Sequence, residues 1–433
     1  MGKSNQSAAQ KADLLNVFGK LKSASDLDFV AAWYLKVAEY IYQTDIRCAF
    51  VSTNSITQGE QVAILWPKLF SLGVRIHFAH RTFSWSNEAR GKAAVHCVII
   101  GFGLQNVADK VIYEYDDIKG KPHAVKVKNI NPYLVDSIDV IAEKRQQPIS
   151  NVLAMRYGNK PTDDGNFIFT DDEKREFLAK EPNSEKYIRL FIGAEEFINK
   201  KSRWCLWLKD ADISELRAMP AVMERVKKVQ EFRLKSTAKP TQKSASTPTR
   251  FFYTSQPDSA YLLIPETSSE NRKYIPIGFV DKSVISSNAT YHIPNAHPYL
   301  FGVLSSAMHN GWMRTVAGRL KNDYRYSASI VYNTFPWPEP NDKQRENIET
   351  TAQSVLDARA KHPQASLADL YDPLTMPANL LKAHQALDKA VDAAHGYKGA
   401  STDAARVAFL FERYQAITSL LPEVGKARKT RKQ

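Results

Sequence analysis

The first hundred residues alternate between helical and strand-like patterns of apolar positions. Apolar residues recur at helical spacing over 26–42, where Asp26 is placed to cap the first turn. The short run Arg47–Val51 is mostly apolar, which is typical of a strand buried on both faces. A helix over about 58–72, a strand over 74–79, a turn over 80–92 and a strand over 93–102 follow. This order predicts the second half of a doubly wound α/β sheet, whose ligands gather at the carboxyl ends of its strands.

Beyond residue 110 the pattern changes. Residues 111–340 mix short β-type runs with loops, a charged helix at about 211–235 and a helix near 296–316, which predicts a mixed α+β domain. Within it, residues 233–250 carry five cations and no acid among many Ser, Thr and Pro residues. That composition predicts a flexible basic loop.

The last part of the chain has a helical pattern. Apolar residues recur at helical spacing in 344–360, 376–395 and 400–420, and a basic tail follows. The tail favours a solvated segment, although a phosphate-binding arm is an alternative. We therefore expect three domains, over residues 1–110, 111–340 and 341–433.

Composition narrows the partners of the chain. Its 433 residues carry a formal net charge of +13 at pH 7, which favours a polyanion such as nucleic acid. A merely basic soluble protein would have the same charge, so charge alone does not decide. No apolar run is long enough for a membrane span, the polar start is not a signal peptide, and the three cysteines lie in separate apolar runs. We expect a cytoplasmic protein with no membrane partner.

The turn Phe83–Lys92 is the first candidate site. It places Phe83 and Trp85 near Arg90 and Lys92, at the sheet edge that would also hold Ser52 and Asn54. A loop that mixes aromatic residues and cations suits an extruded nucleotide, because a base taken out of the helix is held against an aromatic face. The alternative is that both aromatic residues are ordinary core residues.

The segment 314–327 is the second candidate site. It groups arginines, a lysine and two tyrosines around Asp323. Lys or Arg can donate to guanine in the major groove, and Asp can accept from cytosine, so the segment suits a reader of base edges. The alternative is a charged surface hairpin. The ten histidines include no pair at a metal-ligand spacing, so we expect no metal site.

Several segments together resemble the MmeI-like family of DNA adenine-N6 methyltransferases of type II restriction-modification systems. The resemblance runs along nearly the whole chain. It is carried by Gly2-Lys3, Leu27–Tyr34, Phe50–Gln61, Phe83–Ala89, Met155–Pro161, Tyr324–Ser327, Tyr332–Pro338 and Leu370–His395. It implies the C-terminal half of a Rossmann-type class I methyltransferase sheet, then a mixed α+β target-recognition domain and a helical C-terminal domain.

The resemblance also implies a substrate, a cofactor and residue roles. The substrate is adenine in double-stranded DNA, and the methyl donor is S-adenosylmethionine. By this resemblance the flipped-base pocket includes Phe83, Trp85 and Asn87, and Lys321, Asp323 and Arg325 read base edges. Arg90, Lys92 and Arg319 are then expected to contact the DNA backbone.

The sequence departs from the family in two motifs. The family binds S-adenosylmethionine with a glycine-rich loop and the adenine amino group with an Asn-Pro-Pro-aromatic loop, and neither occurs in these 433 residues. Gly2-Lys3 resembles residues just after the second loop. We therefore expect no catalytic residue in this chain and no methyl transfer by it alone, with the missing motifs supplied by a separate N-terminal subunit. The alternatives are a non-catalytic, sequence-specific DNA-binding module and an inactive truncated remnant whose exposed sheet edge prevents folding.

Overall fold

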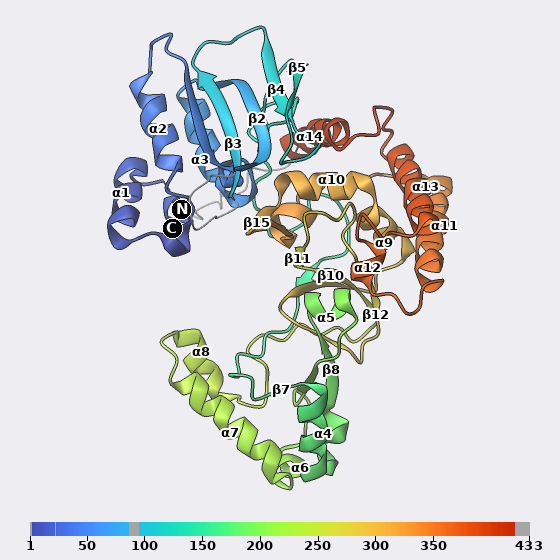
Figure 1. The fold of residues 1–433 in the computed structure, drawn as a ribbon. Helices are drawn as coiled ribbons and strands as arrows, with labels where there is room; N and C mark the ends of the chain where they lie inside the picture. Colours follow the sequence, from blue (N-terminus) through green and yellow to red (C-terminus); the bar gives the residue numbers. More distant parts are fainter. Residues whose placement is uncertain (1, 22, 86–94, 421–433) are drawn as a thin grey trace, which may run out of the picture.

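The computed structural model describes residues 2–21, 23–85 and 95–420 (Figure 1). A sheet and three helices form the N-terminal part, helices from the C-terminal part pack beside them, and an elongated lobe lies at the other end of the molecule. No helix among the described residues is long and apolar enough to cross a membrane.

The N-terminal sheet has five strands in the order β1-β3-β2-β4-β5. The strands are β1 Cys48–Thr53, β2 Arg75–Trp85, β3 Val95–Gly103, β4 Lys110–Glu114 and β5 His123–Val127, and the helices are α1 Ala8–Phe18, α2 Ala31–Tyr40 and α3 Gly59–Ser71. β1 and β2 both pair antiparallel with β3, and β2 pairs parallel with β4, so β1, β2 and β4 end at the same edge. The expected α/β sheet is confirmed, and this carboxyl edge positions the candidate site.

Two expected boundaries in this part are wrong. The helix expected to begin with Asp26 begins at Ala31, because Asp26 lies in a 3-10 turn and its carboxylate is 2.5 Å from the Nζ of Lys3. Residues 80–85, expected in a turn, continue β2 to Trp85 because β3 supplies backbone partners up to that position. Backbone pairing with β3 therefore makes β2 longer than the local residue pattern predicted.

The strand β1 differs from its expected environment. It was expected to be buried on both faces, but it lies at the edge of the sheet and pairs with β3 alone among the described residues. Its Phe50 ring packs against Tyr34 of α2, with ring centroids 5.2 Å apart. On its other face Ala49 is exposed and Val51 is 48% exposed. One face and one edge of β1 are therefore open.

The elongated lobe has its own hydrophobic core. Its strands are β7 Ile168–Phe169, β8 Ile188–Ile192, β9 Trp204–Leu206 and β13 Ile285–Ser286, and its helices are α4 Asp171–Lys180, α5 Ala194–Asn199, α6 Ile213–Arg217, α7 Pro220–Leu234 and α8 Lys239–Lys243. This core is built from residues between Phe167 and Ile285. A second, larger hydrophobic core outside the lobe contains residues from all three expected domains. A sheet in the order β12-β10-β14-β6 lies between them, formed by β6 Arg156–Tyr157, β10 Tyr261–Pro265, β12 Gly278–Val280 and β14 Thr290–Pro294.

The segment 233–250 is not the flexible loop that its composition predicted. The α7 helix continues to Leu234, and α8 and a 3-10 turn at Ser244–Ser246 follow. Arg233 is fully buried and donates hydrogen bonds to five backbone carbonyl oxygens. This one side chain gives an irregular segment a defined shape, because it satisfies carbonyls that a loop would otherwise leave to water.

The C-terminal helices confirm the periodic pattern. They are α9 Pro298–Ser305, α10 Ala307–Val316, α11 Asp342–Ala360, α12 Leu367–Leu370, α13 Ala378–Ala394 and α14 Asp403–Ser419. The single helix expected near 296–316 is two helices, because Ser306 caps α10 by accepting a hydrogen bond from the His309 backbone N–H. α14 lies beside α10 and the N-terminal sheet, where Phe411 packs on Tyr133 and Trp312. The basic tail lies outside the described residues.

Candidate nucleic-acid interface

Phe83 and Trp85 lie on the last residues of β2, at the carboxyl edge of the sheet. They are two residues apart on an extended strand, so both side chains point to the same face, and their ring centroids are 6.1 Å apart. Phe83 also stacks on Tyr115 with an interplanar angle of 20°, whereas Trp85 is 46% exposed. The edge therefore presents an aromatic surface with one ring packed and one accessible.

The end of β1, two strand positions away in the sheet, brings one polar side chain to the same edge. Asn54, which follows β1, is nearly buried and donates a hydrogen bond to the Thr82 hydroxyl at 3.4 Å. Ser52, expected at this edge, instead bonds the Tyr34 hydroxyl at 3.0 Å beneath α2. Asn87, Arg90 and Lys92 lie outside the described residues, so their predicted roles stay predictions.

A short hairpin carries the second candidate segment. Its strands are β15 Gly318–Leu320 and β16 Asp323–Arg325, and β16 pairs on its other side with β11 Thr267–Ser268. Lys321 occupies the turn with a positive φ of 56° and is exposed, while Asp323 is half-buried. Arg325 is 56% exposed, and its Nε and Nη2 atoms lie 3.2 and 3.1 Å from one carboxylate oxygen of Glu266. The hairpin therefore orients two cations and one acid toward its surface.

Arg319 is held inside the protein. Its side chain is 11% exposed, lies 3.0 Å from the Glu270 carboxylate and sits over the Tyr324 ring at 4.1 Å. In this conformation Glu270 neutralises the guanidinium charge. The expected contact of Arg319 with the DNA backbone stays a prediction.

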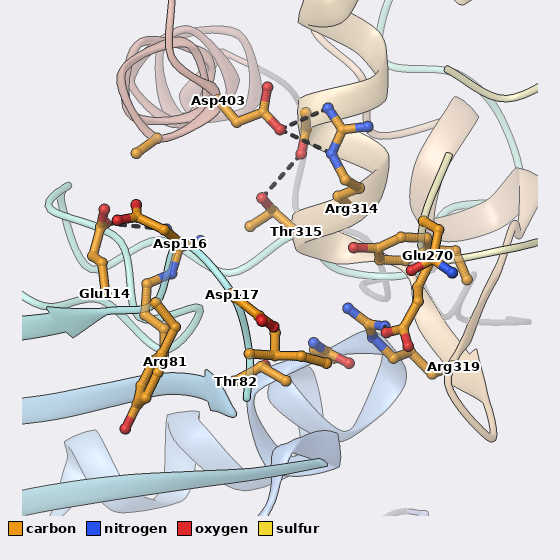
Figure 2. A pocket seen from close by; sticks show the side chains of 17 residues that line it. Arg81, Thr82, Glu114, Asp116, Asp117, Glu270, Arg314, Thr315, Arg319 and Asp403 are labelled. Atoms are coloured by element: carbon orange, nitrogen blue, oxygen red, sulfur yellow. Dashed lines mark hydrogen bonds and ion pairs between the residues drawn. The ribbon is translucent and has the colours of Figure 1, made fainter. Parts of the chain in front are cut away.

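A cavity of about 500 Å³ separates the carboxyl edge of the sheet from the hairpin and from α10 and α14 (Figure 2). Each of its three arginines has a carboxylate partner. The pairs are Arg81 with Glu114, Arg314 with Asp403, and Arg319 with Glu270. Asp116 and Asp117 add two further acids, so the lining has more negative than positive groups. This balance disfavours a phosphate inside the cavity.

Two close approaches link the hairpin to the N-terminal part, one to helix α3 and one to β3 through Glu270, which holds Arg319 of the hairpin. Gly59, at the start of α3, has a φ of 60°, and a Cβ added there would lie 3.0 Å from the Cα of Gly318. On β3, the Nδ1 atom of His96 lies 3.6 Å from the same Glu270 carboxylate that holds Arg319. Burial lowers the pKa of His96, and Glu270 opposes that effect. The hairpin therefore has a fixed position relative to the aromatic edge.

Sequence reasoning missed the acids that surround the predicted cations. Glu266 and Glu270 lie 59 and 49 residues from their arginine partners, and no local pattern indicates such pairs. The acidic run Glu114–Asp117 gave a usable signal, because it follows a strand, but that strand was assigned to the next domain. Within 2–21, 23–85 and 95–420, no three His, Cys, Asp or Glu residues are placed to share a metal ion.

Comparisons with known proteins identify relatives along the whole described fold. The sequence models of the MmeI DNA-methyltransferase domain, target recognition domain and C-terminal domain match residues 1–114, 136–339 and 340–422. DNA methyltransferase A of Bacillus subtilis (strain 168) is 42% identical over 419 residues, which cover 96% of this chain and 47% of that protein.

A solved structure gives the same assignment. The type IIL restriction-modification enzyme MmeI, in complex with DNA, superposes with a TM-score of 0.91 at 70% identity, over 97% of this chain and 56% of that one. The chain thus spans about half the length of these relatives. It belongs to the MmeI family of restriction-modification DNA methyltransferases, and it contains the target recognition domain of that family.

Proposed function

We propose that this chain supplies the base-holding edge and the target-recognition part of a site-specific DNA adenine methyltransferase. The observation that carries the proposal is the attachment of the hairpin to the N-terminal part, through Gly318 against Gly59 of α3 and through Glu270, which holds Arg319 and lies 3.6 Å from His96 of β3. A reader of base edges fixed beside an aromatic surface is the arrangement that modification of one base in a defined sequence needs. The solved relative bound to DNA supports duplex DNA as the partner.

We propose residue roles that agree with the exposure and geometry of the side chains. Trp85 is the accessible ring for stacking on an extruded adenine, and Phe83 packs beside it. The role proposed for Asn87 in this pocket rests on the family resemblance, because Asn87 lies outside the described residues. Lys321 is exposed at the hairpin tip, and Asp323 follows two positions later. Glu266 holds one side of the Arg325 guanidinium and leaves its Nη1 atom without a hydrogen bond to any described residue, which orients that atom for a base acceptor.

The described residues do not form a site for S-adenosylmethionine. The cavity at the carboxyl edge is lined by arginine–carboxylate pairs whose charged groups already have partners, and the chain has no glycine-rich loop. We therefore assign no step of methyl transfer to residues of this chain. In the proposed enzyme, cofactor binding and catalysis come from outside these 433 residues.

The open side of β1 supports pairing with the polypeptide that carries those motifs. An unpaired strand edge is a ready template for another strand, and here Ala49 and Val51 also expose apolar surface beside it. We propose that a strand of the partner pairs with β1. Val51→Lys should then weaken co-purification of the two polypeptides, whereas Leu15→Lys, on helix α1 and 48% exposed like Val51, should not.

Binding-site selection from a random duplex library tests recognition directly. The 433-residue chain should enrich one sequence, and enrichment of none would refute the recognition role. Lys321→Ala should relax preference at one base pair and cost about 1–3 kcal/mol in binding, while Lys343→Ala on α11 should change neither. An equal loss on all sequences would make Lys321 a phosphate contact.

A methylation assay tests the enzymatic part. With radiolabelled S-adenosylmethionine, transfer should require both this chain and a polypeptide that carries the glycine-rich and Asn-Pro-Pro-aromatic motifs. The product should be N6-methyladenine, and methylcytosine would refute adenine specificity. Transfer by this chain alone would show that its own residues bind the cofactor. A chain that selects a sequence and supports no transfer in any mixture would be the non-catalytic binding module.

A further inference from the structure

The C-terminal end of α7, α8 and the turn that follows form a basic surface, which we call the α7–α8 arm and define as residues 233–250. In Figure 1 this arm projects from the elongated lobe, on the side away from α11 and α13. The stretch contains no acidic residue. Four of its five cations are exposed, and none of the four has an acidic partner within 4.0 Å among the described residues. They are Lys235, Lys239, Lys243 and Arg250.

The arm differs from two other places in this protein where cations gather. The cations of the candidate cavity are neutralised by neighbouring carboxylates, as in Arg81 with Glu114 and Arg314 with Asp403. On α7 itself, Lys227 and Lys228 lie within 4.0 Å of glutamates one turn away. The positive charge is therefore uncompensated over the arm, whereas it is compensated in the candidate cavity and on the middle of α7.

Arg233 fixes the shape of this surface. Its Nη2 atom lies 2.8 Å from the carbonyl oxygens of both Pro161 and Arg250, and its Nη1 atom bonds those of Ser244 and Thr247 at 3.2 and 3.3 Å. These bonds tie the beginning and the end of the arm to one buried group. On α8, Lys239 and Lys243 are four residues apart and share one helix face. The four exposed cations are thus attached to one preformed scaffold and are not spread along a flexible tether.

We infer that the α7–α8 arm is a preformed binding surface for the phosphates of duplex DNA, separate from the base-reading hairpin. The inference rests on the proposed DNA binding of this chain and adds a sequence-independent contact to it. Exposed lysine and arginine side chains bind phosphates by charge and carry little base information, so the arm contributes affinity without selectivity. Ordering by Arg233 reduces the entropy lost when the cations meet the DNA backbone.

The test is the salt dependence of binding to a random-sequence duplex, measured by fluorescence anisotropy. The variant carries Lys235→Ala, Lys239→Ala, Lys243→Ala and Arg250→Ala. If all four side chains bind phosphates, the slope of log K against log salt should fall in magnitude by about 3.6. Between about 50 and 200 mM salt, the unmodified protein should then lose about 150-fold more affinity than the variant.

A matched control separates the arm from net charge. It removes four exposed lysines of the C-terminal helical part that have no acidic partner among the described residues. They are Lys343, Lys361, Lys382 and Lys389. This control should keep the slope of the unmodified protein. An equal fall in both variants would make the effect one of overall charge and would overturn the inference.

The remaining outcomes are also decisive. Unchanged slope and affinity in the arm variant, with DNA binding intact in the unmodified protein, would overturn the arm and leave the proposed function standing. No DNA binding by the unmodified protein would refute both. A changed selected sequence with an unchanged slope would make the arm a base reader and would contradict the inference. The double variant Lys239→Ala/Lys243→Ala should show about half the fall in slope, which guards against a folding defect in the larger variant.

Discussion

Replacing Arg233 with methionine should destabilise the elongated lobe without destabilising the rest of the protein. Methionine keeps most of the side-chain volume but removes all five hydrogen bonds to the carbonyl oxygens of residues 161, 162, 244, 247 and 250. Hydrogen bonds to a charged group contribute about 1.5–3 kcal/mol each, so the gross loss is about 8–15 kcal/mol. The buried guanidinium also lost its hydration on folding, which costs several kcal/mol and offsets part of this sum.

The expected net loss is therefore about 3–5 kcal/mol in the free energy of unfolding of the lobe, as when one partner of a buried charged network is removed. Because the lobe has its own core, the loss should be local. Hydrogen–deuterium exchange should show the amides of β7, β8, β9, α4 and α7 exchanging about two to four orders of magnitude faster, while β2, β3 and β10 keep their protection.

Two further variants calibrate this result. Arg250→Met removes an exposed arginine from the same segment and should leave exchange unchanged. Arg233→Lys keeps the charge but cannot reach five carbonyls, so it should fall between the other two. Wild-type exchange rates in Arg233→Met would refute the view that this residue orders the segment.

Three other predictions concern the fold and its pH dependence. Gly101→Ala should lower stability by about 1–3 kcal/mol in thermal denaturation, because the new Cβ would lie 2.0 Å from the Phe78 ring; an unchanged melting temperature would contradict that steric clash. Trp85→Ala should change stability by less than about 0.5 kcal/mol while impairing base extrusion, measured by 2-aminopurine fluorescence in the reconstituted enzyme; a large loss of stability would make Trp85 a core residue. Burial lowers the pKa of His309 to about 3, so its neutral form stabilises the fold above the unfolded pKa of 6.5, and this contribution is lost as pH falls below 6.5. At pH 5 the loss should be about 2 kcal/mol, and denaturation of His309→Gln should show a shallower decline between pH 7 and pH 5.

The spacing of apolar residues predicted correctly those helices that are determined by their own sequence. The apolar spacing over 344–360 and 376–395 located α11 and α13 to within about two residues, because each helix buries one continuous face. The extension of β2 to Trp85 could not be predicted in this way, since its backbone partners belong to β3. Strand length depends on pairing that composition does not encode.

The sequence also did not predict which residues surround the candidate cations. A cation in an acid-free stretch predicts an exposed charge, yet Arg233 is buried because turns from two distant segments converge on it. Arg319 and Arg325 lay in a plausible reading segment, but their acidic partners come from the strand and turn at 266–270. The sequence therefore predicted the segment in which these arginines lie, but it did not predict whether their guanidinium groups are exposed or already paired.

The close approach of Gly59 to Gly318 determines where this protein can accept mutations. A side chain at Gly59 would collide with the hairpin backbone, and its positive φ already disfavours other residues, so the foot of the hairpin tolerates little change. At the tip, Lys321 is exposed and makes no hydrogen bond to any described side chain, so substitution there costs little stability. Backbone atoms hold the foot of the hairpin, whereas side chains are exposed at its tip. Residues at the tip can therefore vary while the hairpin stays folded. Sequence variation among proteins built this way should concentrate at the tip and spare the glycine beneath it.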